Sequence, residues 1–133
     1  MMNSKRMFLL FSHQLTDEQI QDARQNWGVS EFVSLPSDLQ QKWSNVPAEL
    51  ESLQAYAQPF IQWLSDHQLG SSDVVLNQGD FGLSYLLANH IIFNQATAVY
   101  STTVRKAVKE LNMDGEVITT KIFKHQIFRE YGA

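Results

Sequence analysis

Segments typical of strands and segments typical of helices alternate along most of this chain of 133 residues. Residues 7–11 form a short, continuous apolar run, as expected of a central strand that is covered on both faces. A capping box at Thr16 and a glycine at position 28 predict a first helix that ends at Trp27. Further strands are predicted at 31–35, 73–76 and 97–100, and further helices from Ser37 through Trp43, from Pro47 to near Gly70 and over 81–93. This alternation predicts an α/β fold with a mostly parallel sheet and right-handed crossovers.

The sequence is compatible with two structures for the last third of the chain, a helix or a β-hairpin. Apolar residues between positions 104 and 111 have helical spacing, whereas residues 112–115, Asn-Met-Asp-Gly, are typical of a hairpin turn. Residues 116–123 are rich in β-branched side chains, which favours the hairpin. We therefore predict a single domain over residues 1–133, in which a C-terminal antiparallel β-hairpin extends the sheet at one edge.

The composition excludes several classes of protein. A net charge of −4 provides no general attraction to duplex nucleic acid. The absence of cysteine removes disulfides, thiolate zinc sites and thiol nucleophiles, and it fits a reducing compartment, so we expect a cytoplasmic protein. The apolar run 7–11 is too short for a signal peptide, and no run approaches the ~20 residues that cross a bilayer. We expect neither an export signal nor a membrane partner.

The loop at residues 78–82, Gln-Gly-Asp-Phe-Gly, follows a predicted strand and opens a predicted helix. Backbone N–H groups and the helix dipole favour an anion at such a place, and the two glycines allow a ligand to approach the backbone closely. In a structural interpretation, Asp80 is only a helix cap and Gly79 only a turn residue. The candidate ligand-binding residues are Gln78, Gly79, Asp80, Phe81 and Gly82.

A second cluster joins three hydroxyl side chains to two cations, at the expected end of the fourth strand. Hydroxyl groups donate to phosphate oxygens, and an arginine can bind two such oxygens at once. The alternative is ordinary strand threonines beside solvated cations. The candidates here are Ser101, Thr102, Thr103, Arg105 and Lys106.

Basic residues concentrate near the C-terminus. Residues 1–104 contain four Lys and Arg against ten Asp and Glu, whereas residues 105–133 contain six against four. Lys124, His125 and Arg129 are interleaved with aromatic residues, which could supply phosphate contacts and stacking surfaces together. Exposed strands also carry lysine simply to prevent edge-to-edge pairing.

The histidines show no spacing that is typical of a metal site, so we expect no metal and no cofactor. His13 directly follows the first predicted strand, together with Ser12. We therefore expect both to lie at the same carboxyl edge of the sheet as Asp80 and Arg105, where ligands of such sheets bind.

Four short motifs occur in a fixed order along the chain. They are Phe8-Leu9-Leu10-Phe11-Ser12-His13 with Leu15-Thr16 and Gln19, then Gln78-Gly79-Asp80-Phe81-Gly82, then Val99-Tyr100-Ser101-Thr102-Thr103-x-Arg105, and last Phe123-Lys124-His125-x-x-Phe128-Arg129-x-Tyr131. The order and spacing of these motifs resemble those of small CRISPR-associated accessory proteins of type III systems, of the ring-nuclease type. The resemblance covers residues 7–131.

This resemblance implies a Rossmann-like, three-layer fold related to CARF domains. It also implies a homodimer that binds cyclic oligoadenylate, foremost cyclic tetra-adenylate, across its two-fold axis; a cyclic tetranucleotide has the same symmetry as such a dimer. The implied activity is that of a ring nuclease, which linearises this RNA messenger without metal and switches off type III antiviral signalling. A ribose 2′-hydroxyl attacks the neighbouring phosphodiester in such a reaction, so the enzyme mainly supplies positioning and charge stabilisation.

The hypothesis assigns a role to each group of candidates. Arg105 and Lys106 are expected to neutralise the phosphate, and Thr102 and Thr103 to position it. Proton transfer is assigned to His13 or His125. Three alternatives stay open: a binding protein that sequesters the messenger without turnover, a metal-dependent hydrolase that uses Asp80 with His13 or His90, and a structural module without a small ligand.

Overall fold

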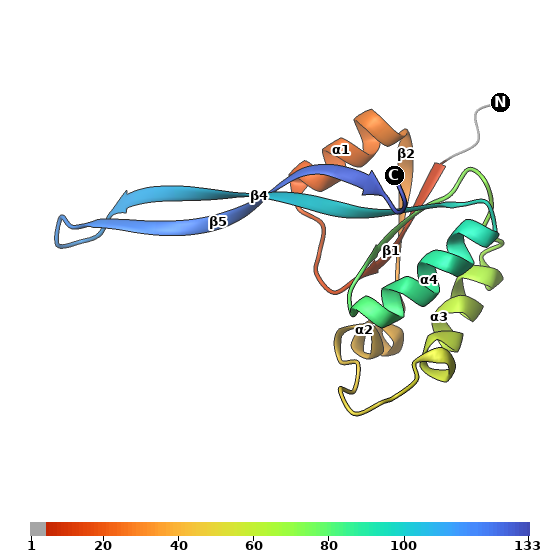
Figure 1. The fold of residues 1–133 in the computed structure, drawn as a ribbon. Coiled ribbons are helices and arrows are strands. Elements are labelled where there is room, and N and C mark those ends of the chain that lie inside the picture. The colour runs from red at the N-terminus through yellow and green to blue at the C-terminus, as the bar shows by residue number, and fades with distance from the viewer. Residues whose placement is uncertain (1–4) are drawn as a thin grey trace.

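Five strands form one sheet, with helices on both of its faces (Figure 1). The computed structural model describes residues 5–133, and no helix within this range is long and apolar enough to cross a membrane. The elements are β1 (Lys5–Phe11), α1 (Asp17–Trp27), β2 (Val29–Ser34), α2 (Ser37–Ser44), α3 (Gln54–Asp66), β3 (Val74–Gln78), α4 (Phe81–Phe93), β4 (Thr97–Leu111) and β5 (Val117–Glu130).

The strand order is β2-β1-β3-β4-β5. Neighbouring strands are parallel from β2 to β4, and β5 is antiparallel to β4 at the edge. The prediction of an α/β fold with a mostly parallel sheet and a C-terminal antiparallel hairpin is confirmed. The chain adds β2 on one side of β1 and β3 on the other, so the direction of strand addition reverses between β1 and β3. Ligands of open α/β sheets bind beyond the carboxyl ends of strands at such a reversal.

Alternate residues of β1 enter two apolar cores on opposite faces of the sheet. Phe8 and Leu10 pack in the core that α2, α3 and α4 cover. Met7 and Phe11 pack in the other core, which α1 covers through Ala23. Figure 1 shows α1 on one side of the sheet and α3 and α4 on the other. Because both faces are covered, β1 is apolar throughout instead of alternating with polar residues.

Local signals in the sequence located α1 and α4 correctly. The Thr16 hydroxyl accepts from the backbone N–H of Gln19 at 3.2 Å, and the side chain of Gln19 accepts from the N–H of Thr16 at 2.9 Å. Gly28 ends the helix in the left-handed region, with φ of 68°. The capping box and the glycine therefore act as predicted.

The prediction of a long helix that opens at Pro47 is wrong. The α3 helix begins only at Gln54, and residues 45–53 form a connection without regular structure. Leu50, which the helical pattern included, is exposed, so it does not belong to the apolar face that buries α3. The apolar spacing continued across the loop by chance, whereas only residues from Leu53 onward make helical contacts.

The predicted end of the fourth strand is also wrong. Instead of ending at position 100, β4 continues to Leu111, because β5 pairs with it almost throughout. The turn at 112–115 is where it was predicted, and its glycine has φ of 80°. Arg105 and Lys106 consequently lie within a strand instead of at the carboxyl edge of the sheet.

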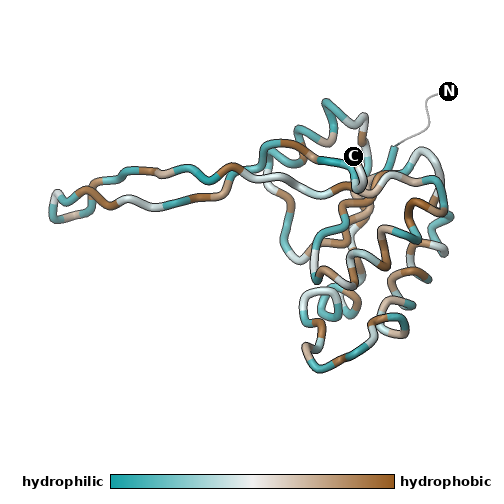
Figure 2. Tube along the Cα trace, in the orientation of Figure 1, coloured by the Kyte–Doolittle hydropathy of each residue, from teal (hydrophilic) through white to brown (hydrophobic). Residues whose placement is uncertain are grey.

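The distal parts of β4 and β5 leave the body of the domain as a two-stranded arm, which we define as residues 103–125 (Figure 1). A register shift between Ser101 and Thr103 marks its root. Figure 2 shows hydrophobic and hydrophilic residues interspersed along the arm.

Candidate functional site

Two pockets open at the carboxyl ends of the parallel strands. One lies at the ends of β1 and β2 and has a volume of about 630 Å³. The other lies at the ends of β3 and the root of β4 and has a volume of about 410 Å³. The reversal of strand order between β1 and β3 separates them, so both occupy the region where this architecture binds ligands.

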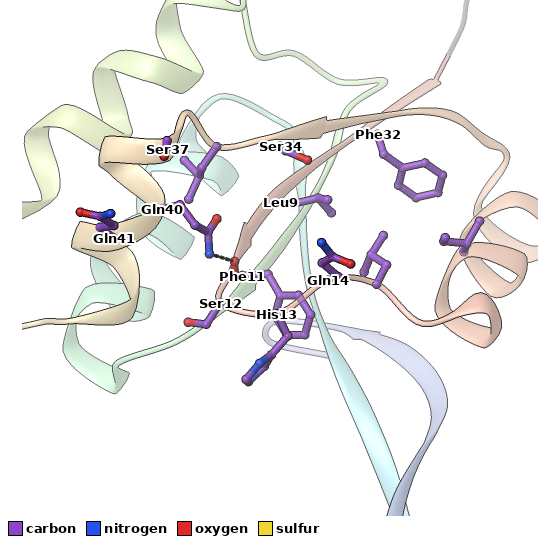
Figure 3. Close-up of a pocket in the computed structure, with 13 residues that line it drawn as sticks. Leu9, Phe11, Ser12, His13, Gln14, Phe32, Ser34, Ser37, Gln40 and Gln41 are labelled. Atoms are coloured by element: carbon purple, nitrogen blue, oxygen red, sulfur yellow. Dashed lines mark hydrogen bonds between the residues drawn. The ribbon is translucent and has the colours of Figure 1, made fainter.

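The pocket beyond β1 is lined by apolar and polar side chains, with no Asp, Glu, Lys or Arg among them (Figure 3). Ser12 and His13 line it, as expected from their place after the first strand. The side-chain amide of Gln40 donates to the carbonyl of Phe11 at 2.7 Å and joins α2 to the end of β1. The full lining is Leu9, Phe11, Ser12, His13, Gln14, Leu15, Ile20, Phe32, Ser34, Leu35, Ser37, Gln40 and Gln41.

Four aromatic rings line the pocket beyond β3, which we call the aromatic pocket. Its lining is Gln78, Gly79, Phe81, Ser84, Tyr85, Ala88, Tyr100, Ser101 and Tyr131. Phe81 and Tyr85 stand one turn apart on α4 and are exposed, Phe81 to 95%. The rings of Tyr100 and Tyr131 meet edge to face, with centroids 5.3 Å apart. Exposed rings beside a cavity provide stacking surfaces for a planar ligand.

A cation stands beside this pocket. Arg129 Nη1 donates to the hydroxyl of Tyr100 at 3.2 Å, and its guanidinium carbon lies 5.6 Å from the centre of the Tyr100 ring. The lining itself contains no charged side chain, and Arg129 contacts it through Tyr100. Burial raises the pKa of Tyr131, whose hydroxyl donates to the carbonyl of Asn77.

Packing and capping explain the loop 78–82. Asp80 is the N-cap of α4 and accepts from the N–H of Leu83 at 3.0 Å. A methyl group at Gly79 would lie 2.7 Å from Nε1 of Trp43, so only glycine fits there. Gln78 ties two neighbours together, because its side chain accepts from the N–H of Ser101 at 2.9 Å and its carbonyl accepts from Trp43 at 3.1 Å. Asp80 therefore caps α4 and Gly79 allows close packing on Trp43, while Gln78, Gly79 and Phe81 also line the aromatic pocket.

Ser101, His125 and Asp22 form a hydrogen-bonded chain at the root of the arm. Ser101 Oγ lies 2.6 Å from His125 Nδ1, and His125 Nε2 lies 2.6 Å from the carboxylate of Asp22. A carboxylate only accepts hydrogen bonds, so a neutral His125 carries its proton on Nε2 and accepts from the serine hydroxyl. The histidine side chain is 4% exposed and Ser101 is 9% exposed. The order of groups is that of a nucleophile or proton carrier, a base and an orienting acid.

The remaining candidates are distributed along the arm and its root. Arg105, Lys106 and Thr103 are exposed on the arm and line none of the pockets described above. Lys124 Nζ lies 3.3 Å from a carboxylate oxygen of Glu18, an exposed ion pair between β5 and α1. The hydroxyl of Thr102 donates to the carbonyl of Ile127 and accepts from its N–H, both at 3.1 Å. It thereby joins β4 to β5 where their register shifts.

A separate expectation concerned metals. Residues 5–133 bring together no group of three or more His, Asp or Glu side chains that could hold a metal ion. Of the pair proposed for the metal-dependent alternative, Asp80 is engaged as a helix cap. Burial lowers the pKa of His90, which lies in the last turn of α4.

Comparison with known proteins places the chain in a family. The Uncharacterized protein MJ1673 family matches residues 5–129. The chain belongs to the MJ1673 family. A relative from Methanocaldococcus jannaschii, described as Uncharacterized protein MJ1673, is 47% identical over 126 residues, which cover 95% of this chain and 96% of the relative. No solved structure matches the chain.

Sequence reasoning missed several residues of the site in this MJ1673-family chain. Tyr85 carried a usable signal, since it stands one helical turn after Phe81 on the same face of a predicted helix. Tyr100 and Tyr131 belonged to noted motifs, but nothing local indicated that they meet. Asp22 lies 103 residues from His125, and no spacing rule connects such a pair.

Proposed function

We propose that this chain is a ring nuclease that binds cyclic tetra-adenylate and linearises it without metal, as a homodimer with a CARF-like fold. The observation that carries the proposal is the aromatic pocket at the carboxyl edge of the sheet, with Arg129 beside it. Its volume of about 410 Å³ falls within the ~300–1,000 Å³ of small-molecule sites. Adenine bases stack on aromatic rings, and a guanidinium binds the phosphate between them.

The proposed reaction needs one proton acceptor and one proton donor. The ribose 2′-oxygen attacks the adjacent phosphorus, the bond from phosphorus to the 5′-oxygen breaks, and a 2′,3′-cyclic phosphate and a 5′-hydroxyl result. Ser101 lines the pocket and is hydrogen-bonded to His125. In our proposal Ser101 takes the 2′-hydroxyl proton while passing its own to His125 Nδ1. His125 then returns a proton to Ser101, which releases one proton to the leaving 5′-oxygen. Asp22 stabilises the imidazolium that exists in between.

These roles refine the ones expected from the sequence. Both ring nitrogens of His125 are engaged, so we assign it to a proton relay through Ser101 instead of direct contact with the ribose. His13 lines the other pocket, and we leave it outside the chemical step. Arg129 takes over phosphate neutralisation from the chain's own Arg105, which is separated from the pocket on the arm.

The test is incubation of excess cyclic tetra-adenylate with a catalytic amount of the protein in EDTA, followed by chromatography of the products. We expect several linear product molecules per protein, ending in a 2′,3′-cyclic phosphate. Intact messenger that co-elutes with the protein would replace the nuclease by a sponge. Intact messenger that does not co-elute would contradict the proposed ligand.

Sequestration without turnover is the second candidate, and burial is the observation that favours it. Ser101 and His125 are almost fully enclosed, which restricts the access of a ribose to the relay. A sponge lowers the free messenger only in proportion to the protein that is present. Stoichiometric protection of the messenger, in place of multiple turnover, would identify it.

Replacing Tyr100 by alanine tests the stacking surface. Loss of one base-stacking ring removes about 1–3 kcal/mol, so the Kd for cyclic tetra-adenylate should rise roughly 5- to 150-fold. Isothermal titration measures this change. Tyr100→Phe is the matched control, because it keeps the ring and loses only the hydrogen bond from Arg129. Equal affinity of Tyr100→Ala and the unaltered protein would remove the aromatic pocket as the binding site.

A further inference from the structure

The arm of residues 103–125 has apolar side chains that the rest of its own chain does not cover. Seven of them are exposed, Phe123 to 72%: Val104, Leu111, Met113, Val117, Ile118, Ile122 and Phe123. Among residues 5–133, its polar contacts with the body are confined to the root, at Lys124 with Glu18 and at His125 with Asp22 and Ser101. A two-stranded hairpin is at best marginally stable in water without a surface to pack on.

The outer face of α4 is the complementary feature of the body. The inner face of this helix is buried through Leu83, Leu87 and Ile91. Its outer face is exposed and mostly apolar, at Phe81, Tyr85, Ile92 and Phe93, the last to 86%, with the uncharged Asn89 one turn after Tyr85. The helix contains no Asp, Glu, Lys or Arg. A helix with apolar side chains on opposite faces normally has both faces covered.

The charges of the arm and of the body favour contact between them. The arm contains five Lys and Arg against three Asp and Glu, a net charge of +2, whereas the rest of the chain contains five against eleven, a net charge of −6. Two arms laid on each other would repel, while an arm on the acidic body of another copy is attracted. The helix α4 itself has no Asp, Glu, Lys or Arg, so a basic arm meets no lysine or arginine on the helix.

The lengths of the two elements also agree. Residues 103–111 of β4 extend over roughly 30 Å at ~3.3 Å per residue. The 13 residues of α4 extend over roughly 20 Å at ~1.5 Å per residue. One arm is therefore long enough to cover the whole outer face of α4.

We propose that the arm of each copy packs on the outer face of α4 of a second copy, in a reciprocal dimer. Phe81 and Tyr85 belong both to this face and to the aromatic pocket, so the partner's arm borders that pocket. The pocket lining has no charged side chain. The role of the arm's cations rests on the proposed function. The cations of the partner's arm complete the phosphate-binding side of the site. This arrangement explains why Arg105 and Lys106 lie away from the pocket of their own chain.

Light scattering on the purified protein without ligand tests the docking. The unaltered protein should have twice the chain mass of 15.2 kDa. An arm variant, Ile118→Ser with Phe123→Ser, and a helix variant, Ile92→Ser with Phe93→Ser, should each have the mass of one chain. Leu50→Ser is the control, because it alters an exposed apolar residue in a loop and should leave the dimer intact.

Mixing the two monomeric variants distinguishes this dimer from other arrangements. The helix variant has an intact arm and the arm variant an intact α4, so one of the two contacts is restored. The mixture should therefore form a dimer, with a higher Kd than the unaltered protein. Arms that pair with each other would leave the helix variant dimeric, and that result would overturn the proposal. A mixture that stays monomeric, or an unaltered protein with the mass of one chain, would also overturn it.

Charge reversal gives a second measurement, which leaves the apolar residues in place. Lys109→Glu with Lys121→Glu should weaken the dimer at least tenfold at low salt, and the difference should shrink as salt is added. Unchanged dimerisation would contradict the role of charge. Failure of the ring-nuclease proposal is visible separately, as a protein that dimerises in this way without binding cyclic tetra-adenylate.

Discussion

Under the proposed ring-nuclease function, replacing Ser101 by alanine should lower the turnover of cyclic tetra-adenylate by roughly 10²- to 10⁴-fold, the usual contribution of general acid–base catalysis. The substitution removes the hydroxyl that connects the aromatic pocket to His125 at 2.6 Å. Single-turnover rates and Kd should be measured together, and Kd should change little because the stacking rings remain.

Two further variants separate the relay from a structural role of Ser101. Ser30→Ala is the matched control, since Ser30 is exposed on β2, lines neither of the two pockets and should retain the original rate. Asp22→Asn leaves a group of the same size beside His125 but lacks the charge that stabilises an imidazolium, so it should lower the rate while Kd changes little. A Ser101→Ala variant that cleaves at the original rate would remove the relay from the mechanism.

Replacing Trp43 by alanine should lower the free energy of unfolding by about 3–5 kcal/mol, as expected for a large aromatic residue in a core. Trp43 is 2% exposed, meets Phe60 edge to face at 5.2 Å, and donates to the carbonyl of Gln78 at 3.1 Å. Urea denaturation measures the change. Trp43→Phe, the milder variant, should lose less because it keeps a ring in the core. A loss below about 1 kcal/mol for Trp43→Ala would contradict this packing.

The contact between Trp43 and Gly79 provides an internal check of the same prediction. Gly79→Ala places a methyl group 2.7 Å from the indole nitrogen and should cost about 1–3 kcal/mol in the unaltered protein. In the Trp43→Ala background the methyl group has room, so the same substitution should cost less. Equal costs in both backgrounds would show that the indole does not restrict position 79.

The sequence predicted elements best where the signal is local. The capping box at Thr16 and the left-handed Gly28 delimit α1 in the structure as they did in the sequence. Asn-Met-Asp-Gly marked the hairpin turn for the same reason, because the turn itself requires those residue types. By contrast, the helix expected from Pro47 rested on apolar spacing alone, and the spacing ran through a loop.

The candidate site was predicted in part. The loops after β1 and β3 were found because the topology of a parallel sheet brings carboxyl ends to one edge. Arg105 was misplaced because the length of β4 depends on pairing with β5, and nothing within the strand marks its end. The meeting of Asp22 with His125 and the convergence of Tyr100 on Tyr131 also depend on distant contacts.

By itself, the sequence determined the α/β class, the order of most elements and the places where loops leave the parallel strands. Those features follow from hydrophobic periodicity, caps and turns, which act over a few residues. Only the tertiary structure decided which side chains share a pocket and that residues 103–125 leave the body as an arm. It also decided that Ser101 and Asp22 contact opposite sides of the His125 imidazole. These contacts join residues far apart in the chain, and their positions are set by how strands pair and how helices pack on the sheet.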